Sequence, residues 1–127
     1  MNQGIVSVRY MVDDIERAVD FYTGQFGFQL GHNASPAFAE VTRGNLRLLL
    51  AGPKSSAGRP MPDGRQPQPG GWNRIHFIVD DIAAEVERLR SAGVSFRNEI
   101  ISGPGGQQTV LDDPSGNPIE LFQPAQQ

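Results

Sequence analysis

The sequence contains no cysteine, and this absence excludes disulfide bonds, thiolate metal sites and cysteine nucleophiles. Strong metal ligands are therefore limited to Asp, Glu and the two histidines, His32 and His76. The first residues, MNQGIVSVRYMVDD, lack the basic and then apolar pattern of a signal peptide, and no apolar run reaches the length of a transmembrane helix. We therefore expect a cytoplasmic protein.

The chain also has little excess charge of either sign. Fourteen acidic and eleven basic residues give a formal net charge of -3, which offers no general attraction to nucleic acid or to an anionic membrane. We expect neither as a partner. With 127 residues, 38% of them hydrophobic, the chain is long enough for one compact core. We predict a single domain, 1–127, whose partners are a small molecule and a second copy of itself.

What the sequence does contain is an internal repeat. The tetrapeptide VDDI occurs at 12–15 and again at 79–82, each time after a stretch with the two-residue period of a strand. In the first copy Ser7, Arg9 and Met11 share one face of this strand, and in the second copy Arg74, His76 and Ile78 do. Apolar residues at helical spacing follow each copy. For the first helix we predict Asp13 as N-cap, with Glu16 completing a capping box, and an end at Gly27; the second helix should end at Gly93.

Further strand signals follow each helix, separated by turn residues. They lie at 26–32, 36–41 and 46–51 in the first half and at 93–100, 107–111 and 119–124 in the second half. Each half is therefore predicted to be a βαβββ module of an α+β fold, with module one at 4–51 and module two at 72–124. Neither half is large enough to bury its sheet alone, so the two modules should pair.

The segment between the modules, 52–71, is rich in Pro, Gly and polar residues. One interpretation is a solvated linker without regular structure, and the other is a flexible flap over a binding site. Trp72 follows this segment, where it would either anchor the loop or stack on a ligand.

Together these stretches resemble a known family. The paired VDDI motifs, FYTGQFGF after the first strand, RLRSAGV at the end of the second helix and DDPSGNPIELFQP near the chain end are similar to sequences of the vicinal oxygen chelate superfamily. This superfamily includes glyoxalase I, extradiol dioxygenases, fosfomycin-modifying enzymes and bleomycin resistance proteins. The resemblance implies a cup-shaped half-barrel made of two βαβββ modules. Because its members perform unrelated chemistry, it does not imply one activity.

The enzymes of this superfamily hold a divalent metal on the first and fourth strands of each module, and the resemblance places these positions on particular residues. The first ligand position falls on Ser7, the second on Leu48 or Leu49, the third on Arg74 and the fourth on Glu120. Only Glu120 is a good metal ligand, since leucine has no lone pair, serine is a weak neutral ligand and arginine stays protonated. No metal or cofactor is therefore expected, and the resemblance is strongest to the metal-free antibiotic-binding resistance proteins.

His76 lies two residues beyond the third ligand position and so faces the cup, about 7 Å further along the strand. We expect it to contact a ligand or to form a structural hydrogen bond, whereas His32 should lie on the surface. Glu120 should form an ion pair with Arg74 or Arg9 at the place where the enzymes hold their metal, unless it is simply an exposed carboxylate at a strand end. Arg47 faces the cup in one register of its strand and points away in the other.

Phe38 and Trp72 are the predicted aromatic contacts for a flat ligand, although Phe38 would fit the core equally well. The complete set of predicted ligand-binding residues is Ser7, Arg9, Phe38, Leu49, Trp72, Arg74, His76, Glu120 and Phe122.

Two functions from different classes are consistent with this set of residues. The first is a metal-independent binding protein that sequesters a hydrophobic or aromatic natural product, as antibiotic-resistance proteins of the superfamily do, and acts as a homodimer. The second is a glyoxalase-type lyase, isomerase or dioxygenase with a rearranged metal site at His76 and Glu120, or a metal-free acid–base enzyme using either residue. A domain that binds a metabolite for regulation is a third possibility. No catalytic residue is assigned, and the sequence favours binding over catalysis.

Overall fold

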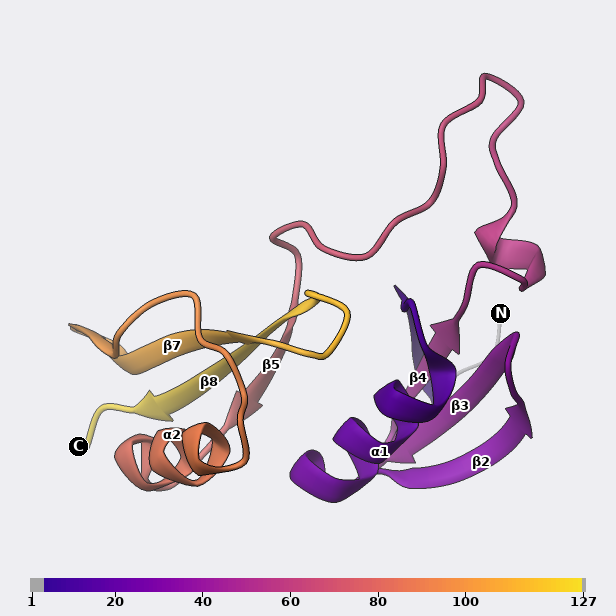
Figure 1. The fold of residues 1–127 in the computed structure, drawn as a ribbon. Coiled ribbons are helices and arrows are strands. Elements are labelled where there is room, and N and C mark those ends of the chain that lie inside the picture. The colour runs from indigo at the N-terminus through magenta and orange to yellow at the C-terminus, as the bar shows by residue number, and fades with distance from the viewer. Residues whose placement is uncertain (1–3, 127) are drawn as a thin grey trace. The chain divides into compact units, whose positions relative to one another are not determined.

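The computed structural model describes residues 4–126 (Figure 1). The chain divides into two compact units, of which the first ends at Gly70 and the second begins at Gly71. Each unit contains one four-stranded sheet and one α-helix. No helix within the described residues is long and apolar enough to cross a membrane.

The first unit contains five regular elements before the linker. They are β1 (Val6–Met11), α1 (Ile15–Phe26), β2 (Gln29–Ala34), β3 (Phe38–Arg43) and β4 (Leu46–Ala51). The strand order is β1-β4-β3-β2, with β1 parallel to β4 and the remaining pairs antiparallel.

The second unit repeats this plan. Its elements are β5 (Ile75–Ile78), α2 (Ile82–Ser91), β6 (Ile101–Gly103), β7 (Gly106–Asp112) and β8 (Pro118–Pro124). The strand order β5-β8-β7-β6, again with one parallel pair, is that of the first unit. The predicted α+β fold with two βαβββ modules is therefore confirmed, whereas a single domain and a cup formed by both modules stay predictions.

In both helices the N-cap is the second aspartate of VDDI, which for the first helix is one residue later than predicted. The Asp14 side chain accepts a hydrogen bond from the backbone N–H of Arg17, and Asp81 does the same for Ala84. The predicted Asp13 cap and its capping box with Glu16 are wrong, because Asp14 is itself still extended (φ -139°, ψ 110°) and the helix starts only after it. The predicted end at Gly27 is correct, since this residue takes the left-handed conformation there (φ 69°).

One face of each sheet packs against the helix of its own unit. In the first unit α1 covers β3 and β4, as the ribbon shows (Figure 1). The buried residues of this layer include Tyr10, Tyr22, Ala39, Val41, Leu48 and Leu50. In the second unit they include Phe77, Ile82, Val86, Leu89, Leu111, Ile119 and Leu121. Because side chains alternate along a strand, the residues before and after each of these core residues in its strand point to the opposite face, away from the α-helix of the same unit.

The strand predicted at 93–100 is not regular, and the first strand after α2 lies later, at β6. Phe96 makes only an isolated bridge to Leu111. Next to it the Asn98 side-chain oxygen accepts hydrogen bonds from the backbone N–H of Val110 (2.9 Å) and from the Thr109 hydroxyl (3.0 Å). A side chain therefore occupies the bonding position that a neighbouring strand would use, and the ladder does not continue.

The linker contains more structure than its composition suggests. A short 3₁₀ helix, η1 (Ser56–Gly58), follows β4, and the buried Ser55 hydroxyl donates a hydrogen bond to the carbonyl of Gly52 at 2.6 Å. The expectation of a segment without regular structure is wrong for this part. Beyond it most of residues 59–71 are exposed. A role as a flap over a binding site stays a prediction.

Candidate functional site

Four predicted site residues of the second unit gather on the sheet face opposite α2. β5 runs parallel to β8 so that His76 is the Cα partner of Glu120 and Ile78 that of Phe122. On the other side of β8, Glu120 pairs with Val110 of β7. Arg74 precedes β5 and extends its side chain to Glu120. Residues 46 positions apart in the sequence thus become neighbours on one surface.

The centre of this surface is an ion pair. The Nε and Nη2 atoms of Arg74 both lie 2.9 Å from Oε1 of Glu120. The side chains are 28% and 11% exposed, so water screens this pair less than it would screen a pair on the open surface. Of the two partners considered for Glu120, the structure selects Arg74, and the alternative of an exposed strand-end carboxylate is wrong.

His76 completes the group around the carboxylate. Its Nε2 lies 3.4 Å from the second oxygen of Glu120, Oε2. Its ring lies 5.1 Å from the Phe122 ring, measured between centroids, at an interplanar angle of 34°. The two tilted rings form a partly exposed aromatic surface beside the ion pair, which can contact an aromatic ligand.

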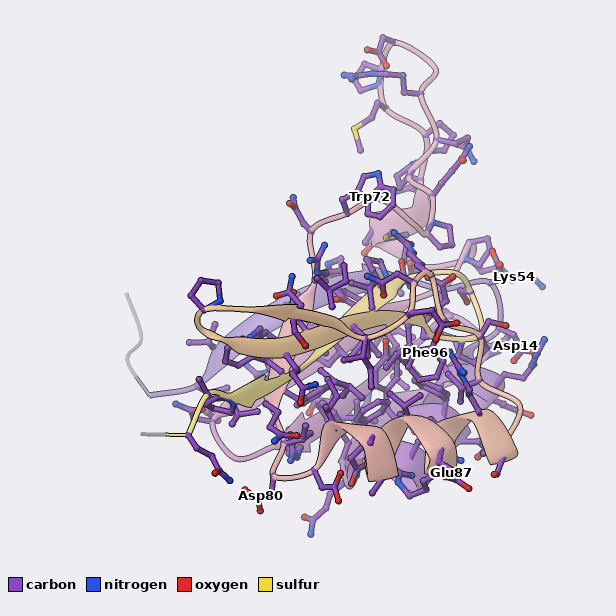
Figure 2. All side chains as sticks on the ribbon, turned by 90° about the vertical axis from the view of Figure 1, so that its left-hand side faces the viewer. Asp14, Lys54, Trp72, Asp80, Glu87 and Phe96 are labelled. Carbon is purple, nitrogen blue, oxygen red and sulfur yellow. The ribbon has the colours of Figure 1, made fainter. Side chains whose placement is uncertain are left out.

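Trp72 is held at the edge of the same unit by an arginine that the sequence did not indicate. The Arg97 guanidinium lies 4.6 Å from the centroid of the indole, and it also donates hydrogen bonds to the carbonyls of Gly71 (2.7 Å) and Gly116 (3.0 Å). Its Nε lies 2.7 Å from a carboxylate oxygen of Asp112. Nevertheless the tryptophan is 71% exposed, and its side chain stands clear of the ribbon (Figure 2). The structure thus shows Trp72 anchored through Arg97, while stacking on a ligand stays a prediction.

In the first unit, strand pairing settles the register that the sequence left open. Ser7 pairs with Arg47 and Arg9 with Leu49 across β1 and β4. Leu49 is therefore on the face of Ser7 and Arg9, whereas Leu48 is fully buried beneath α1. Arg47 is on the Ser7 face too, and its Nε donates a hydrogen bond of 3.0 Å to the Ser7 hydroxyl.

The aromatic residues of this unit lie at its edges. Phe38, at the start of β3, is half-buried and pairs with Ala51. His32 is exposed, as predicted for a surface residue, with its ring 6.3 Å from that of Phe38. Phe38 is thus neither fully in the core nor fully available to a ligand.

The side chains at the four metal-ligand positions of the superfamily do not fit a divalent cation. Ser7 is a weak neutral metal ligand, and Leu49 and Arg74 are not metal ligands. The only carboxylate at these positions, Glu120, is already bound by the guanidinium of Arg74. A fixed positive charge at 2.9 Å from that carboxylate would repel an incoming cation. Within residues 4–126 no group of three His, Asp or Glu side chains is placed to hold a metal.

The comparisons with known proteins agree with this fold. Residues 4–121 match the model of the Glyoxalase/Bleomycin resistance protein/Dioxygenase superfamily. No curated protein matches the chain. Among solved structures, a superfamily member from Sphaerobacter thermophilus is similar, with 30% identity over 94% of this chain and 95% of that one and a TM-score of 0.74.

Two further structures represent different activities. TnmS3, an antibiotic-binding protein from Streptomyces sp. CB03234, is 27% identical, with 98% of each chain covered and a TM-score of 0.72. A lactoylglutathione lyase from Agrobacterium tumefaciens is 20% identical, with 97% of this chain and 95% of that one covered and a TM-score of 0.74, a likeness of fold alone. The match over residues 4–121 and the two βαβββ modules together show that this chain belongs to the glyoxalase/bleomycin resistance protein/dioxygenase superfamily.

Proposed function

We propose that this protein binds a hydrophobic or aromatic small molecule without a metal ion and sequesters it, as antibiotic-resistance proteins do. The observation that carries the proposal is the Arg74–Glu120 ion pair at the positions where enzymes of the superfamily hold their metal. Arginine keeps its charge at every physiological pH, so the pair offers a ligand fixed hydrogen-bond donors rather than an open coordination site.

The surroundings of the ion pair support an aromatic ligand. The His76 and Phe122 rings form one aromatic surface, and the exposed indole of Trp72 forms another within the same unit. Small-molecule sites commonly combine such apolar surfaces with a few directed polar groups. The likeness to TnmS3 over 98% of both chains also favours binding of an antibiotic-like natural product. We further propose that the protein acts as a cytoplasmic homodimer, because the open sheet edges invite pairing.

The first prediction concerns metal ions. Because Arg74 occupies the carboxylate, adding manganese, iron, nickel or zinc to the purified protein should shift its melting temperature by less than 1–2 °C, roughly the effect expected of nonspecific binding. Elemental analysis should find no metal at stoichiometric amounts. Tight binding of one metal per chain, lost in both His76→Ala and Glu120→Ala, would contradict the proposal and favour a metal-dependent enzyme.

The second prediction concerns Trp72. Since it is the only tryptophan in the chain, its fluorescence reports on this residue alone. Menadione, a planar and neutral quinone, should quench it saturably and more strongly than it quenches free N-acetyltryptophanamide. In calorimetry, Trp72→Ala should weaken menadione binding by about tenfold, roughly the value of one stacked aromatic contact.

The matched control for this prediction is Phe96→Leu, which changes an aromatic residue of the same unit that contacts Arg90 instead of the proposed surface. This variant should bind menadione like the original protein. Quenching no stronger than that of N-acetyltryptophanamide, or equal affinities of the Trp72→Ala variant and the original protein, would count against stacking at Trp72.

A second candidate function has one observation in its favour. The 3.4 Å separation between His76 Nε2 and Glu120 Oε2 resembles the pairing of a general base with a carboxylate that orients it. In a metal-free acid–base enzyme His76 would then move the proton. Turnover of an α-hydroxy carbonyl substrate that is lost in His76→Gln, with the fold intact, would favour this function over sequestration.

A further inference from the structure

The first unit carries a second surface of different chemistry, on the sheet face opposite α1. Strand pairing places its residues in rows that run across β1, β4 and β3. The rows are Ser7–Arg47–Thr42, Arg9–Leu49–Glu40 and Met11–Ala51–Phe38. We call the nine residues of these rows the first-unit face.

The first row consists of hydrogen-bonding groups only. Arg47 lies between two hydroxyl residues, and its Nε donates to the Ser7 hydroxyl at 3.0 Å. This bond fixes the guanidinium along the row and leaves its two terminal amino groups for another acceptor. Thr42, on the other side, adds a hydroxyl that can donate in the same direction.

Arg9 supplies a second positive charge to this face. It lies two residues from Ser7 along β1, diagonally across from Arg47, at a distance that long side chains can span. Among residues 4–126 neither arginine lies within 4 Å of a carboxylate oxygen.

The arginines of the second unit are different. Arg74, Arg88, Arg90 and Arg97, which are all the arginines of that unit, each form an ion pair with a glutamate or aspartate. Pairing is therefore the rule in the second unit, whereas Arg9 and Arg47 are two neighbouring arginines on one face that form no ion pair with a carboxylate of the described residues. Two fixed cations side by side repel each other unless an anion lies between them.

The first-unit face contains one acidic residue. Glu40 lies beyond Leu49 from Arg9, and its Oε1 accepts a long hydrogen bond, 3.4 Å, from the backbone N–H of His32. The formal charge of the face is thus two positive against one negative, in a chain with a net charge of -3. Glu40 would oppose an incoming anion without neutralising either arginine.

The third row is apolar and lies directly beside the charged rows. Met11 and Phe38 are half-buried and flank the small, buried Ala51. A ligand whose anionic group lies on the arginines would therefore place an attached ring or chain of carbon atoms over Leu49 and this row.

We infer that the first-unit face is a binding site for an aromatic organic acid, whose oxyanion is held by Arg9 and Arg47 and whose ring lies over Leu49 and Phe38. Guanidinium groups recognise carboxylates and phosphates through paired, charge-assisted hydrogen bonds. Arg9, Leu49 and Phe38 belong to the ligand-binding set predicted from the sequence, and the inference adds Arg47 and the negative charge of the ligand. It does not rest on the Arg74–Glu120 ion pair that carries the proposed function.

The test compares 1-naphthoate with 1-naphthamide, a neutral molecule of nearly the same shape, by isothermal titration calorimetry on the full chain. We expect 1-naphthoate to bind at least tenfold more tightly, and the difference to shrink as salt is raised. Arg9→Gln and Arg47→Gln should each weaken 1-naphthoate binding by about tenfold and leave 1-naphthamide binding unchanged. Glu40→Gln should act in the opposite direction and strengthen 1-naphthoate binding by roughly two- to fivefold, because a like charge is removed.

Arg17→Gln is the matched control. It removes the same charge from the exposed surface of α1 in the same unit and should leave the affinity unchanged. Equal affinities for 1-naphthoate and 1-naphthamide would overturn the inference, as would absence of 1-naphthoate binding. An unchanged affinity in Arg9→Gln and Arg47→Gln, or an equal loss in Arg17→Gln, would also overturn it. Melting temperatures of the variants show that they are folded, and Glu40→Gln tests the same site by a gain of affinity.

Discussion

Replacing Glu120 by alanine should lower the free energy of unfolding by about 3 kcal/mol, at the lower end of the cost of breaking a buried ion pair. The physical reason is that Arg74 would lose its carboxylate partner while its side chain remains only 28% exposed. His76 would lose a neighbouring acceptor as well. Urea denaturation followed by circular dichroism measures this loss.

Two controls separate the ion pair from the effect of truncation. Glu85→Ala breaks the exposed pair between Glu85 and Arg88 on α2, which are 2.8 Å apart, and should cost less than about 1 kcal/mol. The double variant Arg74→Met with Glu120→Leu removes both charges and should recover most of the stability lost in Glu120→Ala. If Glu120→Ala lowers the free energy of unfolding no more than Glu85→Ala does, the Arg74–Glu120 pair contributes no more to stability than an exposed ion pair.

Asp113→Ala should have a similarly large effect, about 3 kcal/mol, because several hydrogen bonds to a buried charged group would be lost together. Asp113 is 4% exposed and lies in the turn between β7 and β8. Its Oδ1 accepts from the backbone N–H of Ser115 (2.8 Å) and of Asn117 (2.9 Å), and its Oδ2 accepts from the Asn117 side chain (3.1 Å). The turn leads directly into the strand that carries Glu120, so ligand binding on the second unit should weaken along with stability.

Asp63→Ala provides the comparison for this turn. Asp63 accepts a hydrogen bond from the backbone N–H two residues ahead, Arg65, at 3.1 Å, as Asp113 does from Ser115, but its side chain is 56% exposed. Water can replace its bonds, so the change should cost less than about 1 kcal/mol. If the two variants unfold at the same urea concentration, burial of the turn is not what makes Asp113 important.

Much of the fold could be predicted because each module repeats one short pattern. The alternation at 74–79 correctly separated His76 from the core residue Phe77, since side chains on a strand point to opposite faces. The start of the first helix was wrong by one residue because VDDI offers two adjacent aspartates that are chemically equal as caps. The segment 93–100 was wrong because its backbone bonds to β7 only around Phe96, through Ser95 and Arg97, and at Asn98 the side chain takes the next bonding position.

The candidate sites were harder to predict, because they depend on contacts between strands. An ion pair of Glu120 with Arg74 or Arg9 could be predicted, since the resemblance put Glu120 and Arg74 at metal-ligand positions, but which arginine binds it could not. Nothing near Arg97 in the sequence indicated that its guanidinium would lie on Trp72. Thr42 and Glu40 were missed as well, because they join the first-unit face only through the antiparallel register of β3 with β4.

The sequence by itself determined the two βαβββ modules and the faces of β1 and β5, which follow from local periodicity and need no distant partner. The resemblance to the superfamily placed Ser7, Leu48 or Leu49, and Arg74 at metal-ligand positions, and the chemistry of these single residues showed that they are poor ligands. The tertiary structure alone decided that Leu49 and not Leu48 faces outward, that Arg74 holds Glu120, and that Arg47 donates a hydrogen bond to Ser7. Such pairs depend on strand register and on long, flexible side chains, and only the packed sheet brings them within hydrogen-bonding distance.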